Sequence, residues 1–382
     1  MSLNSSSQIP YLVSEFQPPV GAMRANPLYF VIVLLLGSSC LKDHAKPGEG
    51  YVDLQVWKDS VIGALYNAST NSVAYNRPDE NGQYKIYISG FDGTNETQLT
   101  WAAWSPDRQQ WAEEWDPTGQ YLFCYIEKTD YVVEDNHTRV PEDAIPGYGA
   151  YTDLWIIRRD GSEAWQLTNL NNDYDKGIIH GAISEDGTIF AWTERIDAPV
   201  LLDVNLAAGA YVFNVADVTY SPTPALGNIR TFMPGGVLAG GEVESISPDK
   251  STILFYSTYE CKNLVTTPIY RMDINTGLTQ QMTTESFSQA PTYAPGGEKI
   301  VYMTGASCDI FPGQLQGADW WLMNADGSGK RRLTNMNVWN HAQSVNKYRL
   351  AGSLSFVNDS TFLGGVMTKS LGLSGYTAIV RF

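Results

Sequence analysis

The stretch Asp-Leu-Trp-Ile-Ile-Arg-Arg-Asp-Gly-Ser-Glu-Ala-Trp-Gln-Leu-Thr at residues 153–168 decides the fold, because the chain repeats its pattern. An aromatic strand leads into an Asp-Gly turn, and a short strand ending in Leu-Thr follows. In each of three copies the aromatic residue stands five positions before the Asp, and the Leu stands six positions after the Gly. The turns of these copies are Asp92-Gly93, Asp160-Gly161 and Asp326-Gly327, and Thr276-Gly277 marks a looser fourth. Internal repetition of this kind is typical of a repeat architecture.

A second type of hairpin alternates with the first. Its turns are built from Pro, Asp, Gly, Asn and Ser, which tight reversals favour, and strands rich in β-branched and aromatic residues leave them. Six such turns follow one another at intervals of 47 to 68 residues, at 69–71, 116–119, 185–187, 247–250, 294–297 and 358–360. A four-stranded propeller blade needs about 40–45 residues, so the longer intervals contain one blade and an inserted loop.

The two hairpin types together predict an all-β protein. We expect a six-bladed β-propeller of four-stranded antiparallel blades, forming a single domain over residues 51–382. Radial stacking would bury both faces of sheets that cannot stand alone. The last blade supplies only three strands, and the alternating residues 51–58 are expected to complete it. The outer half of the third blade, around residues 211–232, has no Asp-Gly turn.

Residues 153–162 and 319–329, each followed by Leu-Thr, resemble the WD-like repeats of the TolB-type β-propeller family. Ser247-Pro248-Asp249 resembles the Ser-Pro-Asp-Gly turn of that family, and the resemblance covers about residues 60–382. It implies the propeller fold. TolB carries an α/β domain before its propeller, whereas here about 50 residues precede the first blade, so no such domain is expected. Propellers serve binding, scaffolding and catalysis alike, and the resemblance leaves the function open.

The composition is acidic and aromatic. The net charge is −16, charged residues make up 17% of the chain and aromatic residues 12%. Nucleic acids and anionic membranes are bound through clustered Lys and Arg, so this charge balance argues against both as the main ligand.

The amino-terminal segment, residues 1–40, has the features of a targeting signal. Arg24 precedes nine apolar residues at 28–36, and small residues lead to Cys40. A run of this length fits a secretory signal, whereas a membrane-spanning helix would need about 20 apolar residues. Met23 is a more natural start than Met1, which leaves it open whether residues 1–22 belong to the native protein.

Cys40 is a candidate for lipidation, with plain signal-peptidase cleavage as the alternative. Leu36 stands four positions before Cys40, whereas the bacterial lipobox prefers Leu three before it. Residues 41–50 would form a tether, and Leu41 in place of Asp favours the outer membrane. The sequence thus predicts a periplasmic or surface-exposed outer-membrane lipoprotein of the bacterial cell envelope, in contact with the membrane only through Cys40.

Three further cysteines fit an oxidising compartment. Cys261 and Cys308 each stand 11 residues after a turn position, Lys250 and Gly297, so they occupy equivalent loops of neighbouring blades and are a candidate disulfide. Cys124 lies in a predicted strand, and we expect it to be a buried free thiol.

The chain has no Gly-x-Ser-x-Gly, His-Glu-x-x-His, Walker or Cys-x-x-Cys motif, so no cofactor or metal is predicted. His180, just before an innermost strand, and His341, before the last blade, are weak catalytic candidates near the channel; alternatively the backbone satisfies them. Glu113 and Glu244 hold equivalent positions six residues before their turns. They are expected either to face each other and bind a cation or exchange protons, or to accept hydrogen bonds from neighbouring amides.

Trp101, Trp104 and Trp111 are the candidate ligand- or partner-binding residues. They are expected in the connection before the second blade, whereas Trp115 is expected in the core. Indole faces suit sugar rings and partner side chains, although these rings could instead pack on the propeller face. The insertion at 129–151 extends the same blade and is a further candidate for specificity.

Two functions follow. The first is a non-enzymatic envelope propeller that binds a protein partner or a glycan through its loop-rich face. The second is a propeller hydrolase or lyase that acts on an extracellular polysaccharide with His180, His341 or the two glutamates. The lack of a catalytic motif in the sequence favours the first.

Overall fold

The computed structural model describes residues 52–128, 151–170, 176–196, 210–236, 240–258, 267–285, 287–307, 315–338, 341–344, 350–367 and 375–382. The segments predicted as the targeting signal and tether lie outside this part. Among the described residues, no helix has the length and apolar character that crossing a membrane requires.

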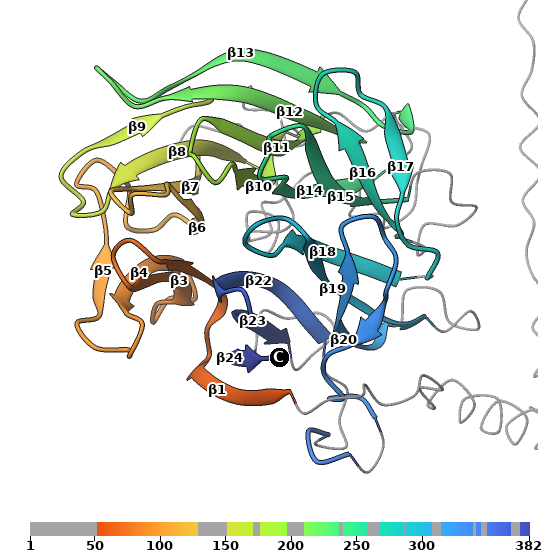
Figure 1. Cartoon of the computed structure of the whole chain (residues 1–382). Coiled ribbons are helices and arrows are strands. Elements are labelled where there is room, and N and C mark those ends of the chain that lie inside the picture. The colour runs from red at the N-terminus through yellow and green to blue at the C-terminus, as the bar shows by residue number, and fades with distance from the viewer. Residues whose placement is uncertain are drawn as a thin grey trace, which may run out of the picture. The chain divides into compact units, whose positions relative to one another are not determined.

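Six blades of four antiparallel strands stand around a common axis (Figure 1); four blades are separate sheets, and the last two form one eight-stranded sheet through a single parallel pairing of Ala318 with Leu350. The first three blades are β2 (Ile62–Asn67), β3 (Ser72–Pro78), β4 (Tyr84–Gly90) and β5 (Thr97–Leu99); β6 (Gln110–Trp115), β7 (Tyr121–Glu127), β8 (Thr152–Arg158) and β9 (Ala164–Gln166); and β10 (Gly177–Ile183), β11 (Ile189–Ile196), β12 (Ala210–Thr219) and β13 (Ala225–Phe232). The next two are β14 (Gly241–Ile246), β15 (Thr252–Ser257), β16 (Ile269–Asp273) and β17 (Thr279–Gln281); and β18 (Phe287–Tyr293), β19 (Lys299–Ser307), β20 (Leu315–Asn324) and β21 (Arg331–Arg332). Each blade has its first strand nearest the axis, which confirms the predicted six-bladed propeller.

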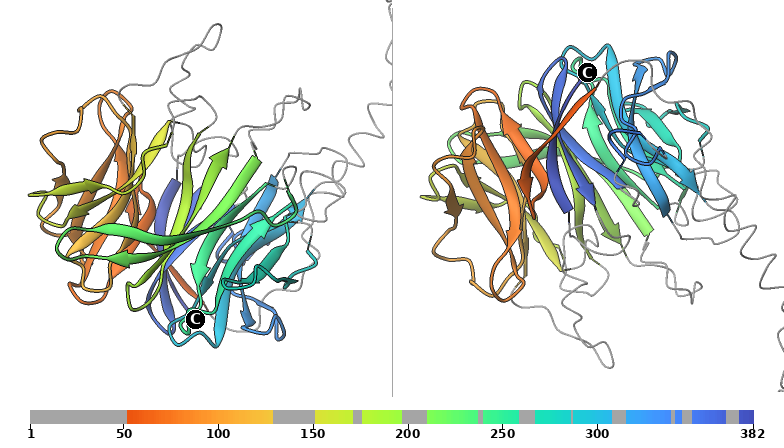
Figure 2. Two further views of the ribbon diagram at one scale, coloured as in Figure 1. Left: turned by 90° about the horizontal axis from the view of Figure 1, so that it is seen from above. Right: turned by 90° about the horizontal axis from the view of Figure 1, so that it is seen from below.

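The sixth blade contains both ends of the described chain. It consists of β22 (Leu350–Asn358), β23 (Thr361–Met367) and β24 (Gly375–Arg381), with β1 (Asp53–Asp59) as the fourth strand. β1 pairs antiparallel with β24 from Asp53↔Arg381 to Asp59↔Tyr376, and the Asp53 carboxylate lies 2.7 Å from the Arg381 guanidinium. The strand expected at 51–58 therefore lies where the last blade needs it, and the two views of Figure 2 show β1 (orange) beside the C-terminal strands.

Six apolar clusters hold the ring together, and each lies between two neighbouring blades. One joins blades one and two through residues such as Ile86 and Trp115, and another joins blades five and six through Trp320 and Phe362. The remaining four fill the other interfaces, including the one between the sixth blade and the first. A neighbouring blade thus covers each face of every sheet, so the apolar side chains on both faces are buried.

The repeated Leu-Thr has a structural role. Thr168 donates a hydrogen bond to Asp153 (2.9 Å) and accepts one from the backbone of Leu154 (2.9 Å). The fifth blade has the same arrangement. Thr334 donates a hydrogen bond to Asp319 (2.8 Å) and accepts one from the backbone N–H of Trp320 (3.1 Å). The pair fastens the outermost strand of the blade to the strand before it, which explains why the Asp and the Thr recur together.

The repeated Asp-Gly is a turn of one conformation. Asp92, Asp160 and Asp326 each accept a hydrogen bond from the backbone N–H two residues later, at 2.9–3.0 Å. The following glycines have φ of +72° to +86°, which a side chain disfavours. The third blade, whose sequence has no Asp-Gly at this place, forms the longer hairpin β12–β13 instead.

We predict that Thr334→Val lowers the free energy of unfolding by about 1–3 kcal/mol, because the buried Asp319 carboxylate loses a donor. Thr100→Val is the matched control: Thr100 holds the same repeat position but is exposed, and Lys85 stands where the second and fifth blades have Asp153 and Asp319. This control should stay within about 0.5 kcal/mol of the parent protein. Urea denaturation measures both, and an equal loss in the two variants would contradict the assigned role.

We also predict that deleting residues 53–59 lowers the melting temperature by about 5–10 °C, since the last blade loses its outer strand and several kcal/mol of packing. Val56→Thr is the control, because Val56 is 53% exposed and its replacement leaves the pairing intact. An unchanged melting temperature after the deletion would show that β1 does not fasten the ring.

Candidate functional site

The innermost strands of all six blades converge on an axial cavity of about 260 Å³. Each of these strands, β2, β6, β10, β14, β18 and β22, has an irregularity in its pairing near the middle. A bulge of this kind leaves a residue unpaired and re-aims side chains. In β6 and β14 the extra residues are Glu113 and Glu244.

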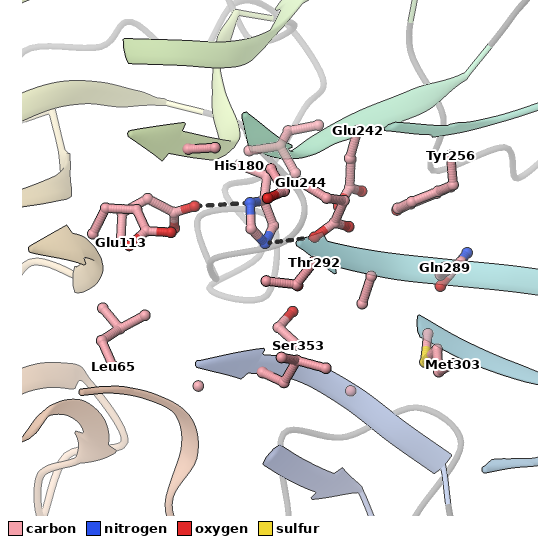
Figure 3. Close-up of a pocket in the computed structure, with 18 of the residues that line it drawn as sticks. Leu65, Glu113, His180, Glu242, Glu244, Tyr256, Gln289, Thr292, Met303 and Ser353 are labelled. Carbon is pink, nitrogen blue, oxygen red and sulfur yellow. Dashed lines mark ion pairs between the residues drawn. The ribbon is translucent and has the colours of Figure 1, made fainter. Parts of the chain in front are cut away.

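His180 lies between these two glutamates (Figure 3). Its Nδ1 is 2.8 Å from Glu113 Oε1, and its Nε2 is 3.5 Å from Glu244 Oε2. The glutamate side chains are only 3% and 5% exposed, whereas that of His180 is 23% exposed. Three residues from three blades therefore form one cluster, in which His180 is the accessible member.

Neighbouring backbone amides hold both glutamates in place. The N–H of Gly181 donates to Glu113 Oε1 at 2.7 Å, and the N–H of Ala290 donates to Glu244. In each case the amide belongs to the next blade around the ring. The two alternatives in the sequence analysis are thus combined: the carboxylates accept hydrogen bonds from backbone amides and also face each other across His180.

Two more carboxyl groups line the cavity beside this cluster, those of Glu114 and Glu242. Burial, followed by the charge of Glu113, raises the pKa of Glu114 to about 8. Burial likewise raises the pKa of Glu244 to about 8 and that of Glu242 above its usual value. The buried half of the cavity therefore retains protons that free carboxyl groups would have lost at neutral pH.

The pKa of the His180 imidazole is also raised, but for a different reason. Burial alone would lower its pKa, but the carboxylates of Glu113 and Glu244 outweigh burial and raise that pKa well above 6.5. The protonated form of His180 is thus favoured, and both of its nitrogens point toward carboxyl groups.

The structure corrects two sequence expectations. His180 was placed just before an innermost strand but lies inside β10, and Trp111 was placed in a connection but lies inside β6. His341 is not among the residues that line the axial cavity; its Nδ1 accepts the backbone N–H of Gln343 at 3.2 Å. The candidate histidines are therefore not a pair at this site.

Trp101 and Trp104 pack against the second blade. Their ring centroids lie 5.8 and 6.0 Å from that of Trp155, and Trp104 is 8% exposed. Trp104 and Trp155 also border a second cavity of about 340 Å³ together with polar side chains such as Gln166. Trp111 instead lines the axial cavity.

The remaining candidates involve cysteine and metal. Cys124 is buried and free, as predicted. Cys40, Cys261, Cys308 and the insertion at 129–150 lie outside the described residues. Within the described ranges, no group of three or more His, Cys, Asp or Glu is arranged to hold a metal ion.

Sequence reasoning missed Glu114, Glu242 and Tyr256 as members of the site. A signal for the glutamates was present: Glu113-Glu114 and Glu242-Val243-Glu244 place two acidic residues each in strands that should be mostly buried. Tyr256 has no such signal, because an aromatic residue in a buried strand is ordinary.

No protein-family model and no curated protein matches the chain. Among solved structures, TolB from Acinetobacter baumannii is 13% identical with a TM-score of 0.48, over 83% of this chain and 65% of TolB. A puromycin-hydrolyzing peptidase of Mycobacterium tuberculosis is 12% identical with a TM-score of 0.50, over 80% of this chain and 40% of the peptidase. An oligogalacturonate lyase solved in complex with manganese is 14% identical with a TM-score of 0.45, over 88% of this chain and 98% of the lyase.

These likenesses concern the fold alone. This chain spans less than two thirds of the length of the TolB and peptidase chains, at 65% and 40%. The six four-stranded blades confirm the predicted propeller fold, and TolB is among the solved structures that this chain is similar to.

We predict that the protein becomes less stable as the pH rises from about 5 to 8. In the folded state Glu114 and Glu244 have pKa values of about 8, above the usual 4.5, so the folded state binds more protons than the unfolded state in this range. Stability therefore falls with increasing pH until both groups have ionised. His180 acts in the same direction, because its pKa is also raised.

The double variant Glu114→Gln/Glu244→Gln should flatten this dependence and stay folded, because an amide resembles a protonated carboxyl group in shape. The exposed Glu298→Gln serves as control. Melting temperatures at pH 5, 6, 7 and 8 measure the slope, and the same slope in the double variant and the parent would contradict the assignment.

Proposed function

We propose that this chain is a non-enzymatic binding protein of the bacterial cell envelope. Its axial cavity would hold a polar group of a ligand, and its loop-rich face would contact a protein partner or a glycan.

The observation that carries the proposal is the state of His180. A general base works best with a pKa near the operating pH, whereas the carboxyl groups of Glu113 and Glu244 on either side of His180 raise the pKa of its imidazole well above the usual value. Such a group is a poor proton acceptor at neutral pH, but its 23% exposed side chain and the carboxyl groups around it can recognise a ligand. Fixed charges in a cavity suit binding and orientation.

The unequal lengths of the connections on the two faces support the choice of the contact surface. The turn from β6 to β7 runs only from Trp115 to Tyr121, whereas β7 and β8 are connected from Glu127 to Thr152. Both ends of this connection, Glu127 and Thr152, lie on the face where the innermost strands begin, which is also the end where Glu242 and Tyr256 border the cavity. Long connections on a rigid ring are where specificity is commonly placed.

The envelope location is part of the proposal. It rests on the apolar run at 28–36, on Cys40 as the lipidation residue and on the TolB-type resemblance of the repeats. Lipidation would leave the propeller outside the bilayer with its faces free.

We predict that the full chain binds saturably to an envelope fraction, either membrane protein or cell-wall glycan. Replacing the exposed Ala102 and Ala103 by Arg on the loop-rich face should weaken this binding at least tenfold. Gln120→Arg, in the tight turn on the opposite face, is the matched control and should bind like the parent. Equal binding by both variants, or no saturable binding to either fraction, would overturn the proposal.

The alternative is a hydrolase or lyase that acts on an extracellular polysaccharide. The contact of 2.8 Å between His180 and Glu113 favours it, because such a pair can donate a proton to a leaving group. Turnover of a polysaccharide that is lost in His180→Ala would establish the enzyme in place of the binding protein.

A further inference from the structure

The charged groups of the axial cavity come from one half of the ring. Blades two, three and four supply all of its histidine and carboxyl groups through β6, β10 and β14. Blades five, six and one supply only neutral lining residues from their innermost strands, among them Gln289, Ser353 and Leu65. Figure 3 shows this division, with the acidic side chains above and Leu65, Ser353 and Met303 below.

The neutral half leaves space because its residues are small. The irregularities of the other three innermost strands leave neutral residues without a register partner: Gly63 and Ala64 in β2, Ala290 and Pro291 in β18, and Gly352 and Ser353 in β22. The resulting volume of about 260 Å³ corresponds to roughly nine water molecules at about 30 Å³ each. A ligand of several heavy atoms therefore has room between the acidic half and the neutral half.

The acidic half has more negative groups than positive ones. Four carboxyl groups, those of Glu113, Glu114, Glu242 and Glu244, surround the single imidazolium of His180. Like charges in one buried site cannot all ionise without a compensating cation. Protons bound to Glu114 and Glu244 reduce the negative charge of this half, and a bound cation would take their place.

The lining also indicates what kind of cation fits. The indole of Trp111 and the side chains of Leu65, Ile183 and Met303 give the cavity an apolar wall. A cation over an indole face gains electrostatic attraction, and an apolar body gains from leaving water. A hard metal ion would instead need six or more oxygen ligands converging on one point, whereas Glu113 and Glu244 are held apart by His180 and by separate backbone amides.

We infer that the axial cavity binds a small organic cation, an amine or guanidinium with an apolar body, and that its binding releases protons from the acidic half. This inference rests on the proposed binding function and names the class of ligand. The ammonium group would lie against Glu114 and Glu244, and the apolar body would lie toward Leu65 and Met303.

The titratable groups that face Glu114 and Glu244 come from β6, β7, β10, β14 and β15. Glu114 is influenced by Glu113, His180 and Glu244, and Glu244 by His180, Glu242 and Glu113. Tyr125 on β7 and Tyr256 on β15 interact with the same carboxyl groups. The cavity residues of β2, β18 and β22 include no titratable side chain. Proton release should therefore come from the blade two to four cluster, that is, from the glutamates and His180.

The test is calorimetric titration of the full chain with hexylammonium, 1-hexanol and hexanoate, which share one apolar body and differ in charge. Hexylammonium should bind at least tenfold more tightly than the other two. Its affinity should rise by up to tenfold per pH unit between pH 6 and 8 for each proton released, and the heat should depend on the ionisation enthalpy of the buffer.

Glu114→Gln/Glu244→Gln should lose at least tenfold in affinity and most of the pH dependence, whereas Glu298→Gln should bind like the parent. Tighter binding of hexanol, hexanoate or Mn²⁺ would overturn the cation class, as would unchanged affinity in the double variant. If hexylammonium fails to bind while the envelope fraction still binds, the inference falls and the proposed function stands. If neither binds, both fall.

Discussion

The structure depends on one constraint: each four-stranded sheet has two apolar faces, and both must be covered. A linear stack would leave two faces bare, whereas a ring leaves none, and apolar clusters fill all six interfaces between neighbouring blades. The chain must therefore return to its starting point. β1 beside β24 is the result, with Val52 and Leu54 packed into the cluster between the fifth and sixth blades.

Closure into a ring also creates the axis. The six innermost strands surround this axis. They lie so close together that large side chains cannot fill the axis along its whole length. The bulges in these strands decide which residues meet at the centre, and they bring Glu113 and Glu244 toward His180 from three separate blades. The geometry of the site is thus a consequence of how the ring closes.

Much of the fold follows from local chemistry and could be read from the sequence. The Asp-Gly turns, the Leu-Thr pairs and the strands between them depend on hydrogen bonds over a few residues, as Asp160 with Ser162 and Asp153 with Thr168 illustrate. The equivalence of Glu113 and Glu244 was also visible, because both stand at one distance from a turn.

The composition of the site could be predicted only in part. A shift of one residue moves a side chain to the other face of a strand, and the bulges that produce this shift have no sequence signal here. His180 was therefore placed outside its strand, and Glu114 and Glu242 were missed. The contact between His180 and Glu244 also depends on the angle between blades, which no local pattern contains.

The ring itself does not require the acidic cluster. Blades one, five and six close the same axis with neutral residues at their irregularities, Gly63 and Ala64, Ala290 and Pro291, and Gly352 and Ser353, so neutral residues satisfy the packing. Burying carboxyl groups is costly, and apolar replacement of a buried ion pair is often neutral or stabilising. Four carboxyl groups and an imidazolium in the other half of the axis therefore have no explanation in the stability of the fold. The proposed cationic ligand would account for these groups, which amides of the next blade hold in place.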